Sequence, residues 1–252
     1  GRVGVLIDDS LGEDALHAAT GRGWWVGRPI ELPGSRPLRF EGSGSLGSQL
    51  VAWPREQVVK CLVHYHPDED VDLRLEQEAR LREAWAATRA SGNELLLEVI
   101  PPGMTPATPA ADAAVLRAVT RLYTIGLKPE WWKLAPMQAP SWTRLAALVA
   151  ARDPQCRGAV ILGLNQPLDD LARGFAAATH PLVRGFMVGR SLWAGPASAW
   201  LAAPPGTAAD EAFVAAVAAN FEQLVDAWRA TRPQGGTVPQ PVAVSAAGVD
   251  AA

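Results

Sequence analysis

Lysine is scarce in this chain, which makes the few lysines informative. Of 23 basic residues only three are lysine, at Lys60, Lys128 and Lys133, and the other twenty are arginine. Arginine keeps its charge at any accessible pH, whereas a buried lysine can lose its proton and attack a carbonyl carbon. Lys60 and Lys133 lie in apolar runs typical of strands, VVKCLV and WWKLAP. Their placement indicates Schiff-base chemistry, and chance survival of a few lysines in an arginine-rich sequence is the alternative.

Several other features are absent, and each absence argues against a class of protein. No basic run accompanies the net charge of −3, which argues against a nucleic-acid partner. No uninterrupted apolar run reaches about 18 residues, so the sequence predicts no membrane-spanning segment. The two cysteines, Cys61 and Cys156, lack CxxC spacing, which predicts packed thiols in a reduced, cytoplasmic protein. No signal-like segment follows Gly1, and we expect the chain to begin part-way through a longer product.

Short apolar runs alternate with helical stretches almost to the end of the chain. The apolar runs predict seven strands, over residues 3–8, 24–32, 58–66, 95–100, 131–136, 158–164 and 183–190. Helices are predicted over residues 12–20, 72–90, 110–125, 141–152, 167–179 and 209–231. The stretch 33–50 is rich in Gly, Ser and Pro and is predicted to be a long loop.

This alternation is typical of an α/β protein whose parallel sheet is covered on both faces. No glycine-rich phosphate-binding motif follows the first strand, which weakens an open nucleotide-binding sheet. Charged residues inside several strands favour a (β/α)8 barrel, where sites gather at the carboxyl ends of the strands. Seven strands are one short of eight, so we expect the first strand upstream of residue 1. One domain is predicted over residues 1–232, followed by a disordered tail over 233–252.

Three charged residues inside strands form the strongest candidate site. Strand alternation places Lys60, Glu98 and Lys133 on faces that would point into the barrel. Isolated charges there would cost several kcal/mol each, so the three residues are either salt-bridged or functional. In the functional hypothesis a lysine with a lowered pKa attacks a carbonyl, and Glu98 shuttles protons. In the other, the three residues only fix the strand register.

Further candidates lie at other strand ends. Gly163, Gly189 and Arg190 end the last two strands, where (β/α)8 barrels commonly hold a phosphate. Arg28, near Glu31, could bind an anionic group of a substrate or form a structural ion pair.

Two histidines raise the alternative of a metal site. His64 and His66 lie on one face of a predicted strand, but the sequence offers no clear third and fourth ligand. Substrate hydrogen bonding or packing explains them more simply. The sequence therefore predicts no metal and no cofactor.

The chain resembles the C-terminal domain fused to bacterial 5-dehydro-2-deoxygluconokinase, which belongs to inositol catabolism. The resemblance covers about residues 3–230 and rests on the runs GEDALHAATGRGWWVGRPIELPGSRPL, SQLVAWPREQVVKCLVHYHPD, ELLLEVIPP, LYTIGLKPEWWKL, DPQCRGAVILGLN and VRGFMVGRSLW. That domain is similar to the class I tagatose-1,6-bisphosphate aldolases, which are (β/α)8 barrels. Members usually carry a first strand ending in a motif like FDHR, whereas this sequence opens at the second strand.

The resemblance implies roles for the candidate residues. Lys133 in WWKL matches the Schiff-base lysine, Glu98 in LLLEVI the acid, and Lys60 in VVKCL the second amine. Gly189-Arg190 in VGRSLW matches the Gly-Arg pair on the phosphate side of those aldolases.

The resemblance also implies a reaction and partners. The implied reaction cleaves 6-phospho-5-dehydro-2-deoxy-D-gluconate to dihydroxyacetone phosphate and malonate semialdehyde, with a fused or associated sugar kinase as partner. A metal-dependent lyase using His64 and His66, and a non-catalytic domain that binds sugar phosphates, remain as alternatives. The sequence leaves a homo-oligomer open.

Overall fold

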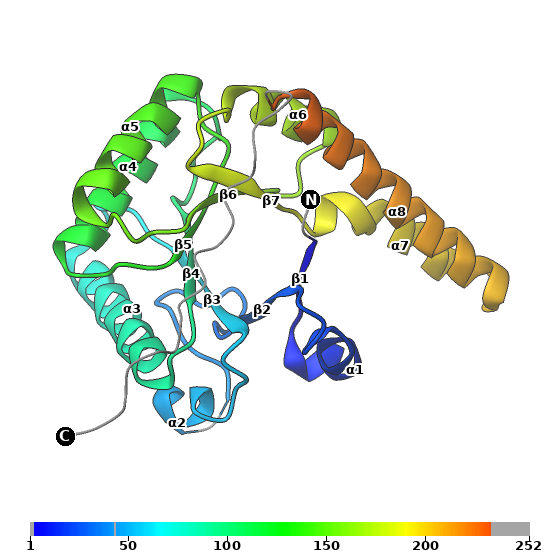
Figure 1. The fold of residues 1–252 in the computed structure, drawn as a ribbon, viewed down its shortest axis with the longest axis horizontal. Coiled ribbons are helices and arrows are strands. Elements are labelled where there is room, and N and C mark those ends of the chain that lie inside the picture. Colours follow the sequence, from blue (N-terminus) through cyan, green and yellow to red (C-terminus); the bar gives the residue numbers. More distant parts are fainter. Residues whose placement is uncertain (1–2, 43, 233–252) are drawn as a thin grey trace, which may run out of the picture.

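The computed structural model describes residues 3–42 and 44–232, which form a parallel seven-stranded sheet with helices around it (Figure 1). The strands are β1 (Gly4–Leu6), β2 (Trp25–Pro29), β3 (Gln57–His64), β4 (Leu95–Ile100), β5 (Trp131–Leu134), β6 (Gly158–Leu162) and β7 (Val183–Met187). Each strand pairs in parallel with the next one along the chain. All seven predicted strands are confirmed; β4 has the predicted bounds, β3 begins one residue earlier and ends two residues earlier than predicted, and the other five are shorter than the apolar runs.

The sheet curls into an open half-barrel, in which β1 and β7 are the two edge strands of the described residues (Figure 1). The predicted α/β architecture is therefore confirmed, with one strand fewer than a closed (β/α)8 barrel. The strand expected upstream of residue 1 and the tail predicted over 233–252 lie outside the described residues.

Helices follow the strands along the chain. They are α1 (Asp9–Ala19), α2 (Leu46–Leu50), α3 (Val71–Ser91), α4 (Pro109–Thr124), α5 (Ala139–Arg152), α6 (Leu168–Ala177), α7 (Arg190–Ala202) and α8 (Thr207–Ala230). The prediction missed α2 and α7. The short α2 lies in the Gly/Ser-rich stretch and begins where the Ser45 side chain accepts the Ser48 N–H. In α7, Pro196 interrupts the pattern that would indicate a helix.

Helix α3 shows how local sequence fixes an element. The Asp70 side chain accepts the N–H groups of Asp72 and Leu73, at 2.9 and 3.2 Å, and so caps the first turn. At the other end Gly92 has a φ of +79°, a left-handed conformation that glycine adopts without a steric penalty. These two signals explain why the predicted helix over 72–90 differs from the observed one by a single residue at each end.

Alternation along the strands separates an apolar outer face from a charged inner face. On β3 the outward side chains of Val59, Cys61 and Val63 are at most 1% exposed and belong to the same core as Leu81 of α3. The alternate residue Lys60 points inward. The core between the sheet and its helices thus fixes the strand faces, and the strand faces fix which side chains enter the half-barrel.

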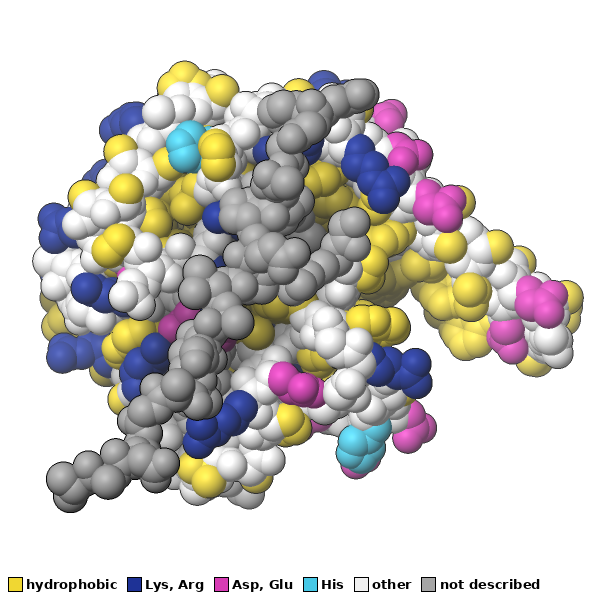
Figure 2. Space-filling model, in the orientation of Figure 1, with side chains coloured by type: hydrophobic (Ala, Val, Ile, Leu, Met, Phe, Trp, Pro, Cys, Tyr) yellow, Lys and Arg dark blue, Asp and Glu magenta, His cyan; other side chains and the backbone are white. Residues whose placement is uncertain are grey.

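Helices α7 and α8 pack against each other as an arm that extends away from the sheet (Figure 1). Apolar side chains lie along this arm (Figure 2), and Trp193, Trp200 and Leu201 of α7 are exposed. Within residues 3–42 and 44–232, no helix combines the length and the apolar character that crossing a membrane requires.

Burial on the outer face predicts which leucines support the fold. Leu97 of β4 is 1% exposed, so Leu97→Ala should lower the free energy of unfolding by about 2–5 kcal/mol, because it removes buried contacts and leaves a cavity. Leu201→Ala, at a position that is 76% exposed, should change it by less than about 0.5 kcal/mol. Urea denaturation followed by circular dichroism measures both, and similar losses in the two variants would contradict the assignment of the core.

Candidate active site

A row of four buried charged side chains crosses the inner face of the half-barrel, and we call it the charge chain. It runs from Lys133 of β5 through Glu98 of β4 and Lys60 of β3 to Glu31, which lies just beyond the end of β2. Lys133 and Glu98 are direct partners in the strand register, and Pro29 of β2 is the partner of Lys60. The parallel register therefore brings together side chains that are far apart in the sequence.

Hydrogen-bond distances show that the charge chain is continuous. Lys133 Nζ lies 3.1 Å from Glu98 Oε2, and Lys60 Nζ lies 2.9 Å from the same oxygen. Lys60 Nζ also donates to Glu31 Oε1. The predicted meeting of Lys60, Glu98 and Lys133 is confirmed, and Glu31 joins them as a fourth member.

Burial makes this arrangement energetically demanding. The four residues are only 5–8% exposed, and a buried charge costs several kcal/mol unless an opposite charge compensates it. Two ammonium groups and two carboxylates balance one another in charge. One polar atom remains uncompensated, since Glu31 Oε2 is buried and has no hydrogen-bond partner among the described residues.

The charge chain shifts the pKa values of its two lysines in opposite directions. Burial lowers the pKa of Lys60, but attraction to Glu98 and Glu31 outweighs burial and raises this pKa to about 12. For Lys133 burial is again the largest effect; Glu98 opposes it and repulsion from Lys60 adds to it, so that the pKa of Lys133 is lowered. Burial raises the pKa of Glu98, but the two lysines together lower it below its ordinary value.

These shifts make proton loss easier for Lys133 than for Lys60. A neutral amine is the form that adds to a carbonyl, and Lys133 reaches that form at a lower pH than free lysine does. Lys60 stays a cation because it lies between two carboxylates. Glu98 stays ionised and touches both lysines, so it can accept or donate a proton beside Lys133.

Loops at the carboxyl ends of β6 and β7 come together beside the charge chain's strands. A Cβ atom on Gly163 would lie 2.8 Å from Val188 Cγ1 and 3.4 Å from Ser191 Oγ, so the loop after β6 closely approaches the start of α7. Gly189 occupies the N-cap of α7 without a side-chain cap, and Arg190 begins the helix. Gly163 and the Gly189-Arg190 pair thus follow β6 and β7, as the sequence indicates, and their binding of a phosphate stays a prediction.

The start of α7 presents polar groups that have no partner among the residues that the structure describes. The first N–H groups of a helix carry partial positive charge and lack partners within the helix. Arg190 is exposed and Ser191 Oγ is buried, and neither side chain has a hydrogen bond or ion pair within the described part of the chain. The prediction overlooked Ser191, which directly follows the Gly-Arg pair.

Arg28 lies apart from the charge chain. In the strand register it is the partner of Val59, which belongs to the outer face, whereas the next residue, Pro29, pairs with Lys60. Its guanidinium forms an ion pair with Asp9 and stacks over the Trp53 ring at 3.8 Å from the centroid. Of the two alternatives that the sequence leaves open for Arg28, the structure shows an ion pair, and its partner is Asp9, not Glu31.

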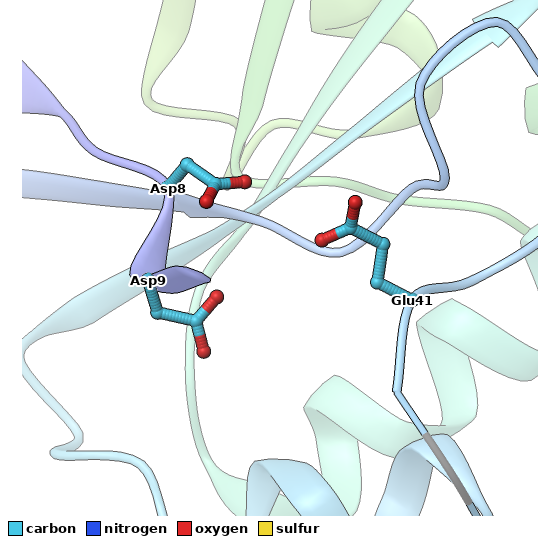
Figure 3. A group of neighbouring side chains, drawn as sticks. All are labelled: Asp8, Asp9 and Glu41. Atoms are coloured by element: carbon cyan, nitrogen blue, oxygen red, sulfur yellow. The ribbon is translucent and has the colours of Figure 1, made fainter. Parts of the chain in front are cut away.

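Three acidic side chains gather near the carboxyl ends of β1 and β2 (Figure 3). Asp8 and Asp9 stand at the start of α1 and Glu41 in the loop after β2, with carboxylate oxygens within 4.8 Å of one another. Burial raises the pKa of Glu41, and Asp8, Asp9 and Glu31 raise it further. Asp8 already caps α1 and Asp9 pairs with Arg28, so two of the three acids have partners in the fold.

The two histidines do not form a metal site with the described residues. Strand β3 ends at His64, and His66 lies in the turn that follows, where its Nδ1 accepts the Asp68 N–H at 3.1 Å. Asp8, Asp9 and Glu41 are the one group of three potential ligand side chains within residues 3–42 and 44–232. The expected shared strand face of His64 and His66 is therefore wrong, because the strand stops between them.

Glu31 is the main residue that sequence reasoning missed. The sequence marks it only as a neighbour of Arg28, although it follows Gly27 and Pro29 at alternate positions of the same run. That spacing is the signal that could have placed it on the inner face. The signal was weak because β2 ends at Pro29, and strand alternation says little about residues beyond a strand.

Comparison with solved structures identifies the class of fold. The chain is similar to a fructose-bisphosphate aldolase from Plasmodium falciparum, with a TM-score of 0.55 and 14% identity over 87% of this chain and 70% of that chain. It is also similar to Cgl0159 from Corynebacterium glutamicum, with a TM-score of 0.60 and 18% identity over 88% and 71%. At these identities the shared feature is the aldolase-type (β/α) barrel fold.

A match between the sequence and a family model shows which family the chain belongs to. The chain belongs to the family described as uncharacterized proteins conserved in bacteria, DUF2090, whose model matches residues 1–232. Curated protein sequences gave no match.

The pKa shifts predict how the reactivity of Lys133 depends on pH. Its amine reacts when neutral, so its rate of reductive methylation should rise as pH increases through its lowered pKa. Lys60→Met removes a repelling cation and should move this rise to higher pH. Glu98→Gln removes an anion that favours the ammonium form and should move it to lower pH.

Peptide mass mapping measures the rate of methylation at Lys133, and the exposed Lys128 is the reference for reagent activity. Identical pH profiles in the wild type and the two variants would contradict the electrostatic coupling.

Proposed function

We propose that this chain is a class I aldolase, which cleaves or forms a carbon–carbon bond through a Schiff base on Lys133. One observation carries the proposal: a buried lysine with a lowered pKa is hydrogen-bonded to Glu98, 3.1 Å away, with a second ammonium on the same oxygen. The position of this group inside an aldolase-type fold supports the same reading, because barrel sites lie at the carboxyl ends of the strands.

The charge chain supplies the steps of imine chemistry. Neutral Lys133 adds to a ketone carbon and forms a carbinolamine. Glu98 takes one proton from the nitrogen of the adduct and passes it to the oxygen; a second proton, from solvent, lets this oxygen leave as water. The resulting iminium accepts the electron pair of the breaking carbon–carbon bond. Throughout the cycle Lys60 remains charged and favours the neutral form of Lys133.

A phosphorylated substrate suits the anion site at the start of α7. There Gly163 would allow a phosphate to approach the backbone closely. Arg190 adds the N–H donors of its guanidinium to the N–H groups at the start of the helix. The substrate that we propose is 6-phospho-5-dehydro-2-deoxy-D-gluconate, cleaved to dihydroxyacetone phosphate and malonate semialdehyde in inositol catabolism. The family resemblance supports this choice, together with a fused or associated sugar kinase as the partner. Arg28 has no role in it, since Asp9 neutralises its charge.

Borohydride trapping tests the Schiff base. Incubation with dihydroxyacetone phosphate and borohydride should add one reduced adduct per chain, detected by intact mass and mapped to Lys133. Lys133→Met should abolish the adduct, because no other amine of the site combines burial with a lowered pKa. Lys128→Met removes an exposed lysine and should leave the yield unchanged. An unmodified wild-type chain, or an adduct that survives Lys133→Met, would overturn the proposal.

Arg190 should act on the phosphate and not on the imine. Arg190→Ala should reduce trapping of dihydroxyacetone phosphate at low concentration by roughly tenfold, the effect of losing about 1.4 kcal/mol of charge-assisted binding. Trapping of unphosphorylated dihydroxyacetone should stay the same. Arg173→Ala, which removes an exposed arginine of α6, is the matched control. Equal losses with both ketones would argue against a phosphate site at Arg190.

A further inference from the structure

The far end of the charge chain carries a carboxylate oxygen without a hydrogen bond. Glu31 Oε1 accepts from Lys60, while Glu31 Oε2 is buried and finds no partner within residues 3–42 and 44–232. The side chain is 9% exposed, so bulk water does not compensate this oxygen. A buried acceptor left unpaired is costly, and such atoms in native structures call for an explanation. A hydroxyl group of a substrate would satisfy Glu31 Oε2.

The spacing along the charge chain determines which hydroxyl Glu31 can reach. Glu98 Oε2, at 3.1 Å from Lys133 Nζ, lies beside the imine itself. Lys60 Nζ is 2.9 Å further on, and the Glu31 carboxylate is one more hydrogen bond away, so it lies within about 9 Å of Lys133 Nζ.

The distances within a bound substrate fall inside this limit of about 9 Å. In an extended iminium the oxygen of the β-hydroxyl lies roughly 5 Å from the lysine nitrogen, from standard bond lengths. An acceptor for its proton then lies roughly 7–8 Å from that nitrogen, after one further O–H···O contact. Glu98 is hydrogen-bonded to the lysine nitrogen itself, whereas the limit of about 9 Å that the hydrogen bonds set for Glu31 includes the separation that this hydroxyl requires.

The two carboxylates also differ in the hydrogen bonds that their oxygens already accept. Glu98 Oε2 is held by two ammonium groups, which stabilise its ionised form. Glu31 contacts a single ammonium, through its other oxygen. Glu31 Oε2 is therefore free to accept a hydrogen bond from a substrate hydroxyl.

We propose that Glu31 is a catalytic residue, which accepts the proton of the substrate β-hydroxyl as the carbon–carbon bond breaks. This role rests on the proposed aldolase function. The hydroxyl proton passes to Glu31 Oε2, the carbon–oxygen bond becomes a carbonyl, and the electron pair of the breaking carbon–carbon bond moves into the iminium to give an enamine. The enamine carbon then takes up one proton, Glu31 releases one, and water frees the product from Lys133. Atoms and charge balance without an oxidant or a second substrate.

The competing explanation is that Glu31 only positions Lys60. In that case its loss would act through Lys60 on Lys133, and imine formation would suffer together with bond cleavage. The proton-acceptor role predicts a separation, because imine formation on dihydroxyacetone phosphate breaks no carbon–carbon bond.

The experiment therefore measures both steps in Glu31→Gln. Borohydride trapping with dihydroxyacetone phosphate, across pH, reports imine formation. Cleavage of 6-phospho-5-dehydro-2-deoxy-D-gluconate, and condensation of dihydroxyacetone phosphate with malonate semialdehyde and other small aldehydes, report the bond step. We expect trapping within about threefold of wild type, with a pH profile that moves only toward lower pH because an anion near Lys133 is lost, and a loss of bond cleavage on the order of 10²–10⁴-fold. Glu41→Gln removes a neighbouring acid outside the charge chain and should change neither rate by more than about threefold.

The outcomes separate this role from the aldolase proposal. A parallel loss of trapping and cleavage in Glu31→Gln, or full cleavage without the carboxylate, would overturn the role of Glu31 and leave the Schiff base standing. A wild-type chain that is trapped but performs no carbon–carbon chemistry would overturn it as well. Absence of the wild-type adduct would overturn both proposals. If Glu31→Gln does not fold, Glu31→Asp keeps the charge and retracts the acceptor by one methylene, and its cleavage should fall while trapping persists.

Discussion

Burial of four charges in one row is the constraint on which the rest of this structure depends. Glu98 Oε2 accepts from two ammonium groups at 3.1 and 2.9 Å, and Lys60 passes the connection on to Glu31. Removing any member would leave a buried charge without compensation, which typically costs more than the row contributes. These ion pairs therefore depend on the strand register. A shift of β4 or β5 by one residue would move the side chain of Glu98 or Lys133 to the outer face, where it would lie in the apolar core.

The charge chain lies in the middle of the sheet, away from both edge strands. Three of its members lie on β3, β4 and β5, and Glu31 follows β2. Each of these four strands pairs with a neighbouring strand on both sides. The open edges at β1 and β7 are removed from this row. Lys60, Glu98 and Lys133 are each less than 10% exposed at this central position.

The mouth of the half-barrel has two sides of opposite electrical character. The side formed by the loops after β6 and β7 presents helix N–H groups and Arg190, whereas the side at β1 and β2 presents Asp8, Asp9 and Glu41. A phosphate favours the first side by its charge. An elongated substrate anchored there would pass Lys133 first and Glu31 last, which agrees with imine formation at the former and proton transfer at the latter.

The sequence by itself determined the α/β architecture, the inward face of Lys60, Glu98 and Lys133, and the position of Gly163 and the Gly189-Arg190 pair after the last two strands. These follow from alternation within strands and from the rule that parallel strands end at one edge, both of which are local regularities. The tertiary structure alone decided which lysine loses its proton more easily, because that depends on Lys60 touching two carboxylates and Lys133 one. It also decided the place of Glu31 and the outward direction of Arg28, since both depend on contacts between segments that are distant in sequence.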